Sequence, residues 1–225
     1  MNRRVLAWLL VALAAVLAQF WLPRTAPCHR DAPRGLGALL LQFRPLVAGL
    51  MLGDLIVRGR AQDFTALDRA RRILALYPEP PEQRDFIAYY LAFSVSLGES
   101  DDERRKLWVR AAAELYQEGL QRDDDPILHS GLGLVYREKA FAFAPPVDPL
   151  VEAARHFVRA AELAADTTYA EYGAASILAL LQRGTAQDRA CAAACARRLL
   201  ASAAFAACER EHPSDLRRRL EAIGR

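Results

Sequence analysis

The sequence lacks the short motifs that mark common catalytic and cofactor sites. It contains no Walker phosphate loop, no GxGxxG nucleotide fingerprint, no GxSxG nucleophile turn, no HExxH zinc motif and no CxxC pair. These absences do not exclude an enzyme, but they favour a non-catalytic protein. We therefore predict no catalytic, cofactor-binding or metal-binding residue.

An excess of charge of one sign is also lacking. The 30 lysines and arginines nearly balance the 27 aspartates and glutamates, for a net charge of +3. Lysine is especially scarce, because Lys106 and Lys139 are the only two. Since a nucleic-acid surface needs a strong basic patch, we predict no nucleic-acid partner.

Residues 5–22 have almost no polar side chains, because Gln19 is the only polar residue among them. About 20 apolar residues cross a bilayer as a helix, so we predict a transmembrane signal anchor over 1–22, with membrane contact through 5–22. A Pro-rich linker over 23–34 follows. Two arginines before the apolar run favour a periplasmic or other extracytoplasmic location for the rest of the chain. Cleavage as a signal peptide, giving a secreted soluble scaffold, is the alternative.

What the chain has in abundance is alanine and helical apolar periodicity, so residues 35–225 are predicted to form an all-α domain. Proline and glycine fall between the periodic segments. Ser100 with Glu103 matches a capping box, and Ser214 is predicted to cap the last helix. We expect helical hairpins and closing helices over 36–59 with 63–77, 82–98 with 101–121, 126–143 with 149–165, 168–182 with 186–200, and 202–210 with 214–223.

The third hairpin resembles a tetratricopeptide repeat (TPR). The resemblance is carried by residues at the family's spacing: Leu132, Gly133 and Tyr136 in the first helix, and Ala153, Phe157 and Ala160 in the second. The connection between the two helices is longer than the family's pattern. The resemblance implies a TPR-like α-solenoid, in which helical hairpins stack side by side.

A second resemblance covers residues 43–141. This region is similar to a family of bacterial TPR-like proteins that have a single N-terminal membrane segment. The similar pieces are FIAYYLAFSVS at 86–96, the helix at 108–120 and LGLVYREK at 132–139. The resemblance implies a membrane-anchored scaffold for protein–protein interaction. We expect a protein or peptide partner on the concave face of the solenoid.

One helix is unusually aromatic. Phe86, Tyr89, Tyr90 and Phe93 fall on one face by helical spacing, while Leu91 lies on another. A helix that is apolar nearly all round is either fully buried or presents a groove. The four aromatic residues are therefore the predicted partner-binding groove.

The C-terminal cysteines leave three interpretations open. Cys191, Cys195, Cys208 and His212 have the ligand count of a zinc site, but buried cysteines also pack as small apolar residues. In an oxidising compartment, Cys208 could form a disulfide with Cys191 or Cys195. The alternative function is a redox- or metal-linked module, or an enzyme-complex subunit, that uses these cysteines.

Two other polar features are interpreted as structural. His129 and His156 lie on the two helices of the third hairpin and could face each other. The three aspartates at 123–125 lack the spacing of a calcium loop, so we interpret them as a solvated turn before the helix that starts at Pro126.

Overall fold

The structure is a computed structural model that describes residues 49–76, 81–211 and 216–224. The regular elements within these residues are helices, without a strand, and the predicted all-α fold is confirmed. No helix in the described ranges has both the length and the apolar character needed to cross a membrane. The predicted anchor and linker, residues 1–22 and 23–34, lie outside the described residues.

The helix boundaries follow the predicted hairpins closely. The first described helical segment covers residues 49–60. The elements after it are α3 (Thr65–Leu76), α4 (Pro81–Tyr89), η1 (Tyr90–Val95), α5 (Ser96–Gly98), α6 (Asp102–Leu120), α7 (Pro126–Glu138), η2 (Ala140–Ala142), α8 (Pro149–Leu163), α9 (Thr167–Arg183), α10 (Ala186–Leu200), α11 (Ala203–Glu211) and α12 (Leu216–Gly224). Because α4, η1 and α5 are continuous, residues 81–98 form one rod, here called the aromatic helix.

Acidic N-caps start most of the central helices. The N-cap of α6 is Asp101, whose Oδ1 accepts a hydrogen bond from the Arg104 N–H at 2.8 Å. The predicted Ser100 cap is therefore wrong, and the aspartate adds a negative charge that favours a helix N-terminus. The predicted Ser214 cap lies outside the described residues. The remaining caps that accept first-turn hydrogen bonds are Asp125, Asp148, Asp166 and Thr185.

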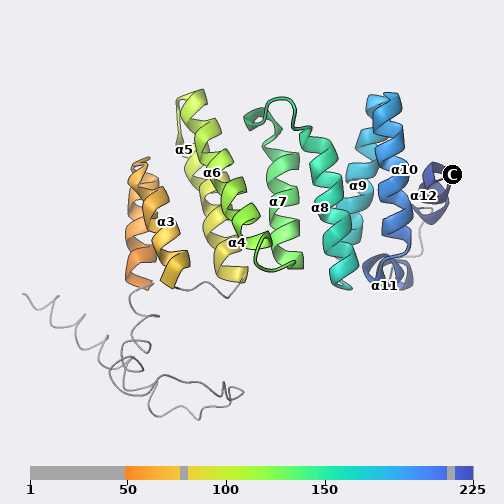
Figure 1. Ribbon diagram of the computed structural model, residues 1–225, viewed down its shortest axis with the longest axis horizontal. Helices are drawn as coiled ribbons and strands as arrows, with labels where there is room; N and C mark the ends of the chain where they lie inside the picture. Colours follow the sequence, from red (N-terminus) through yellow and green to blue (C-terminus); the bar gives the residue numbers. More distant parts are fainter. Residues whose placement is uncertain (1–48, 77–80, 212–215, 225) are drawn as a thin grey trace, which may run out of the picture.

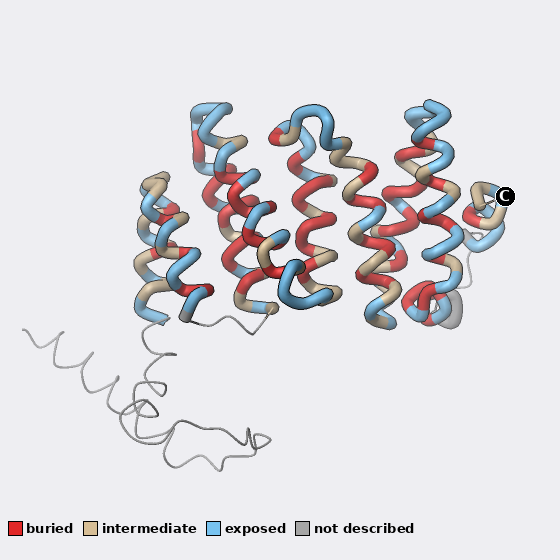
Figure 2. Tube along the Cα trace, in the orientation of Figure 1, coloured by how far each residue is buried: buried red, intermediate tan, exposed pale blue. Residues whose placement is uncertain are grey.

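The helices stand side by side in chain order, as Figure 1 shows. Each packs against the next helix, and several also pack against the next but one: α4 contacts α6 and α7, and α8 contacts α9 and α10. The buried residues face the inside of this row, and the exposed ones lie on its outside and at the helix ends (Figure 2). Two apolar clusters result, one running from Leu55 to Phe157 and the other from Val151 to Leu220.

Glycines in α7 let the neighbouring helices approach closely. A methyl group built on Gly133 would lie 3.0 Å from the Phe157 ring of α8. A methyl group on Gly131 would lie 2.5 Å from both the Tyr116 ring and the Asp85 carboxylate. Separations this short leave no room for a side chain, so the glycines set the distance between α7 and its neighbours.

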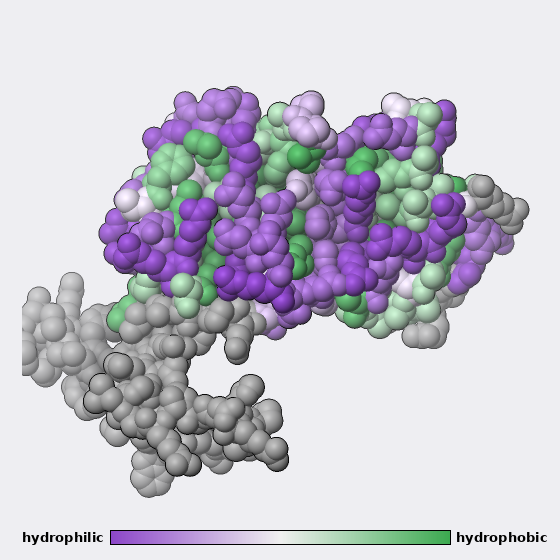
Figure 3. Space-filling view, in the orientation of Figure 1, coloured by the Kyte–Doolittle hydropathy of each residue, from purple (hydrophilic) through white to green (hydrophobic). Residues whose placement is uncertain are grey.

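The C-terminal helices do not extend the row in simple order. α11 packs mainly against α9 and α8, whereas α12 covers α10 (Figure 1). The view in Figure 3 looks onto the side formed by α6, α8 and α10, and this side is mainly hydrophilic with narrow apolar strips. A partner that needs a large apolar contact therefore has little to bind on this side.

Candidate interaction site on the aromatic helix

The aromatic helix contains a π-helical segment at its centre, over Tyr90–Val95. The Ser96 N–H donates to the Leu91 carbonyl, five residues back, and the Ser96 hydroxyl donates to the Ala92 carbonyl. A π-helix has more residues per turn than an α-helix, so side chains beyond Tyr89 do not continue the α-helical stripe. π-helical turns within α-helices are frequent at functional sites, which directs attention to the side chains around this one.

One side of the aromatic helix presents exposed rings. Phe86 is 48% exposed and Tyr89 is 47% exposed. Tyr89 stacks on the half-buried Phe93, with their ring centroids 4.5 Å apart. We call Phe86, Tyr89 and Phe93 the aromatic face. The structure thus brings Tyr89 and Phe93 of the predicted groove into contact, and Phe86 lies three residues before Tyr89 on the same helix.

A buried cation lies at the edge of the aromatic face. Lys139, the residue after α7, is only 7% exposed, and its Nζ lies 4.9 Å from the centroid of the Phe93 ring. Within the described residues Lys139 forms no salt bridge. Burial lowers the pKa of Lys139, the Arg105 cation lowers it further, and Glu138 opposes both effects. A carboxylate arriving at this edge would offset the desolvated positive charge.

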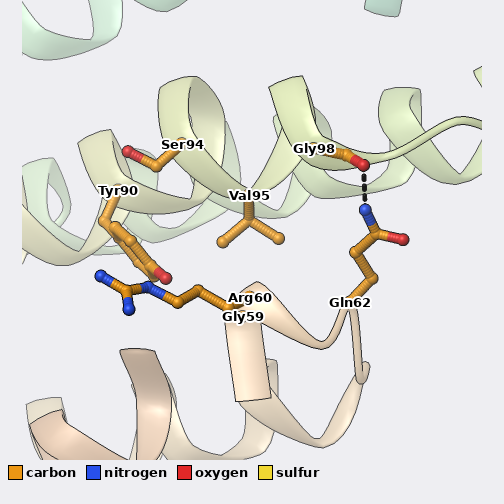
Figure 4. Close-up of a pocket in the computed structure, with 7 residues that line it drawn as sticks. All are labelled: Gly59, Arg60, Gln62, Tyr90, Ser94, Val95 and Gly98. Carbon is orange, nitrogen blue, oxygen red and sulfur yellow. Dashed lines mark hydrogen bonds between the residues drawn. The ribbon is translucent and has the colours of Figure 1, made fainter. Parts of the chain in front are cut away.

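The fourth predicted groove residue, Tyr90, points elsewhere. Its hydroxyl donates to the Ile56 carbonyl at 3.0 Å, and a methyl group on Gly59 would lie 2.9 Å from the Tyr90 ring. Tyr90 and Ser94 line a 380 Å³ pocket between the aromatic helix and residues 49–60 (Figure 4). The prediction that all four aromatic residues share one face is thus corrected, because Tyr90 contacts the preceding helix whereas Tyr89 stacks on Phe93.

Arginine and glutamine side chains occupy the same pocket. Arg60 lies beside the Tyr90 ring, and the Gln62 amide donates to the Gly98 carbonyl (Figure 4). Because these contacts join residues 49–62 to the aromatic helix, we interpret the pocket as a structural joint that fixes the orientation of the aromatic face.

The predicted C-terminal cysteine site is only partly assembled. Cys191 and Cys195 lie on α10 as free thiols, so neither forms the predicted disulfide with Cys208. Cys208 lies on α11 and is buried in the same apolar cluster as Cys195. His212 falls outside the described residues, and the described ones contain no group of three or more His, Cys, Asp or Glu that could hold a metal ion. The structure thus supports packing for Cys195 and Cys208.

The two histidines of the third hairpin do meet. Their Nδ1 atoms are 2.7 Å apart, and the His129 Nε2 lies 2.7 Å from an Asp124 carboxylate oxygen. Burial lowers the pKa of His156 to about 4, and the neighbouring His129 and Arg155 contribute to the shift. The two histidines thus face each other, and this short polar chain joins α7 to α8.

The turn at 123–125 has more contacts than the sequence suggested. Asp125 caps α7, as expected for the residue before Pro126. Asp124 is exposed, as predicted for a solvated turn, and it also contacts His129 and pairs with Arg159 of α8. The arginine lies 35 residues away, so no local pattern indicated the pair.

Comparison with known proteins adds no assignment: no family model, curated protein or solved structure matches this chain. Functional inference therefore depends on the surfaces described above.

Proposed function

We propose that this protein is a membrane-anchored, non-catalytic scaffold with a TPR-like domain, and that its aromatic face binds an acidic and apolar peptide segment of a partner protein. The observation that carries this proposal is the aromatic face itself, in which Phe86 and Tyr89 are half-exposed and the third ring, Phe93, lies beside the buried Lys139 cation. Exposed rings on the same face as a buried cation fit a ligand that offers both an apolar side chain and a carboxylate.

The arrangement of the hairpins supports a TPR-like domain. Consecutive helices stack in chain order, and Gly133 of α7 contacts the Phe157 ring of α8. These two residues belong to the pattern on which the TPR resemblance was recognised. In such solenoids the first helices of successive hairpins line one face, and that is the series to which the aromatic helix and α7 belong.

Covering the two exposed rings would contribute a substantial part of the binding free energy. Each of the two half-exposed rings would lose roughly 100 Å² of accessible surface on being covered, which is about 2 kcal/mol per ring. Pairing Lys139 with a carboxylate would add a charge-assisted hydrogen bond of about 1.5–3 kcal/mol, before the cost of association. The sum, roughly 5.5–7 kcal/mol before that cost, is below the roughly 8 kcal/mol of a micromolar complex, so these contacts alone support a weak peptide interaction.

The membrane part of the proposal depends on residues 5–22, where the apolar run is long enough to span a bilayer. An anchor at this end would hold residues 49–224 close to the membrane surface. We propose that the anchored domain is exported and retains its partner there.

Selection of peptides from a random displayed library, using the full-length protein in detergent, tests the binding proposal. We expect the selected peptides to be rich in Asp and Glu next to large apolar residues. Tyr89→Ser should abolish their binding, and Lys139→Gln should remove the preference for acidic residues. Leu107→Ser on α6 is the matched control, because Leu107 is 45% exposed.

Two results would count against the binding proposal. One is a selected set without acidic residues, and the other is equal loss of binding in the Tyr89→Ser and Leu107→Ser variants. Circular dichroism of each variant establishes that it remains folded. The anchor is tested separately, by alkaline extraction of membranes and by N-terminal sequencing of the mature protein.

A further inference from the structure

A second groove is lined by residues of α8 and α10. These two helices stand away from the aromatic helix (Figure 1). Its volume is 290 Å³. Its lining includes two cysteines, two arginines and two alanines, namely Cys191, Cys195, Arg155, Arg198, Ala190 and Ala194.

The two thiols lie one helical turn apart. Cys191 and Cys195 are four residues apart in α10, so their side chains project from the same side of the helix into the groove. Both are free, Cys191 half-buried and Cys195 buried. The alanines at 190 and 194 leave the space beside the thiols open. A small ligand can therefore reach both sulfur atoms from the groove.

We propose that Cys191 and Cys195 together bind one monovalent thiophilic cation, Cu(I). Thiolates are soft ligands that select Cu(I), whereas structural zinc takes four ligands. No third His, Cys, Asp or Glu completes such a group among the described residues. On binding, each thiol releases one proton to solvent and forms one sulfur–copper bond, and no electron is transferred.

The arginines suit the charge of the resulting complex. Two thiolates and one monovalent cation carry a net charge of −1, which would be costly to hold in a groove without a counter-charge. Arg155 and Arg198 line the same groove and supply positive charge. Arg198 also pairs with Glu162 at 2.7 Å, which holds its guanidinium in place.

Proton release makes the affinity depend on pH. Burial raises the pKa of the Cys195 thiol to about 12, with a further contribution from Cys191, while Arg198 and Arg155 act in the opposite direction. A bound metal displaces the proton from a coordinating thiol, so the apparent affinity for Cu(I) should increase with pH.

The test is an anaerobic titration of the reduced full-length protein with Cu(I) in competition with a chromophoric Cu(I) chelator. We expect one Cu(I) per chain. Cys191→Ser and Cys195→Ala should each lose it. Cys208→Ser should retain it, and so should Cys28→Ser in the predicted linker over 23–34. Cys191 is only half-buried, so its variant decides the question if the Cys195 variant fails to fold. No binding by the wild type, or binding that survives Cys191→Ser, would overturn the proposal.

A second measurement separates this site from adventitious thiol binding. Arg155→Gln leaves both sulfur atoms in place but removes part of the counter-charge, so Cu(I) affinity should decrease about tenfold, as for other groups outside the ligand set. An equimolar amount of Zn(II) should not displace the Cu(I). Unchanged affinity in Arg155→Gln, or displacement by Zn(II), would contradict the bis-thiolate site.

Discussion

Replacing Gly131 by alanine should destabilise the protein, although alanine is the better helix former. A methyl group at this position would lie 2.5 Å from the Tyr116 hydroxyl and from the Asp85 carboxylate. Tyr116 is fully buried and donates to Asp85 at 2.7 Å. Neither side chain can withdraw without breaking that hydrogen bond or moving α6 relative to α4.

The magnitude follows from three contributions. Alanine gains about 1 kcal/mol of helix propensity over glycine. Forcing a methyl group into this contact costs about 2 kcal/mol, and weakening the Tyr116–Asp85 hydrogen bond costs about 1 kcal/mol. The net loss in the free energy of unfolding should therefore be about 2 kcal/mol.

Urea unfolding followed by circular dichroism measures this loss. The matched control is Gly53→Ala in the helix over 49–60, where no atom of the described residues lies within 4 Å of the added methyl group. The control should raise the unfolding midpoint, because it keeps the propensity gain without the clash. An unfolding midpoint for Gly131→Ala that equals or exceeds the wild-type value would refute the packing argument.

Three further predictions concern pH, capping and thiol access. The free energy of unfolding should decrease by at most about 3 kcal/mol as pH falls from 6.5 toward about 4, because His156 stays neutral in the folded protein while the unfolded chain takes up a proton. The urea midpoint of His156→Phe should depend less on pH over this window than that of the wild type. An equal dependence would contradict the lowered pKa of His156. Asp148→Ala should lower the free energy of unfolding by about 2 kcal/mol and Asp166→Ala by about 1 kcal/mol, because both residues cap a helix but only Asp148 also pairs with Arg183. Equal losses in thermal or urea unfolding would show that the Asp148–Arg183 pair contributes no stability. Iodoacetamide should label Cys191 faster than Cys195 in the folded protein, because Cys195 is the more buried of the two thiols, and mass spectrometry measures the two rates. Equal labelling rates would contradict the burial difference.

Local sequence patterns were sufficient for the helices themselves. Proline after an aspartate marked the starts of α7 and α8, and Gly184, which adopts a left-handed conformation, marked the end of α9. The exact N-cap residue was less predictable. Ser100 and Asp101 are adjacent and both can cap a helix, but only Asp101 is the N-cap of α6. These signals act over a few residues, so a single sequence contains them.

The candidate site was only half predictable. The aromatic residues were recognisable as a cluster, but the sequence indicated neither the π-helical segment over Tyr90–Val95 nor the contact of Tyr90 with Ile56. Lys139 attracted attention only as one of two lysines, because its contact with Phe93 joins residues 46 positions apart. Nor did any local pattern indicate that Arg155 of α8 would face the cysteines of α10.

By itself the sequence determined the all-α character, the hairpin boundaries and the presence of an aromatic helix, because propensity, periodicity and capping are properties of neighbouring residues. Only the tertiary structure decided which faces of those helices are covered. The contacts of Gly131 with Tyr116 and of Cys191 with the α8 groove depend on how separate helices pack. Packing is governed by shape and volume across the whole core, and so the surfaces left open for a partner or a metal ion emerge only when all the helices are in place.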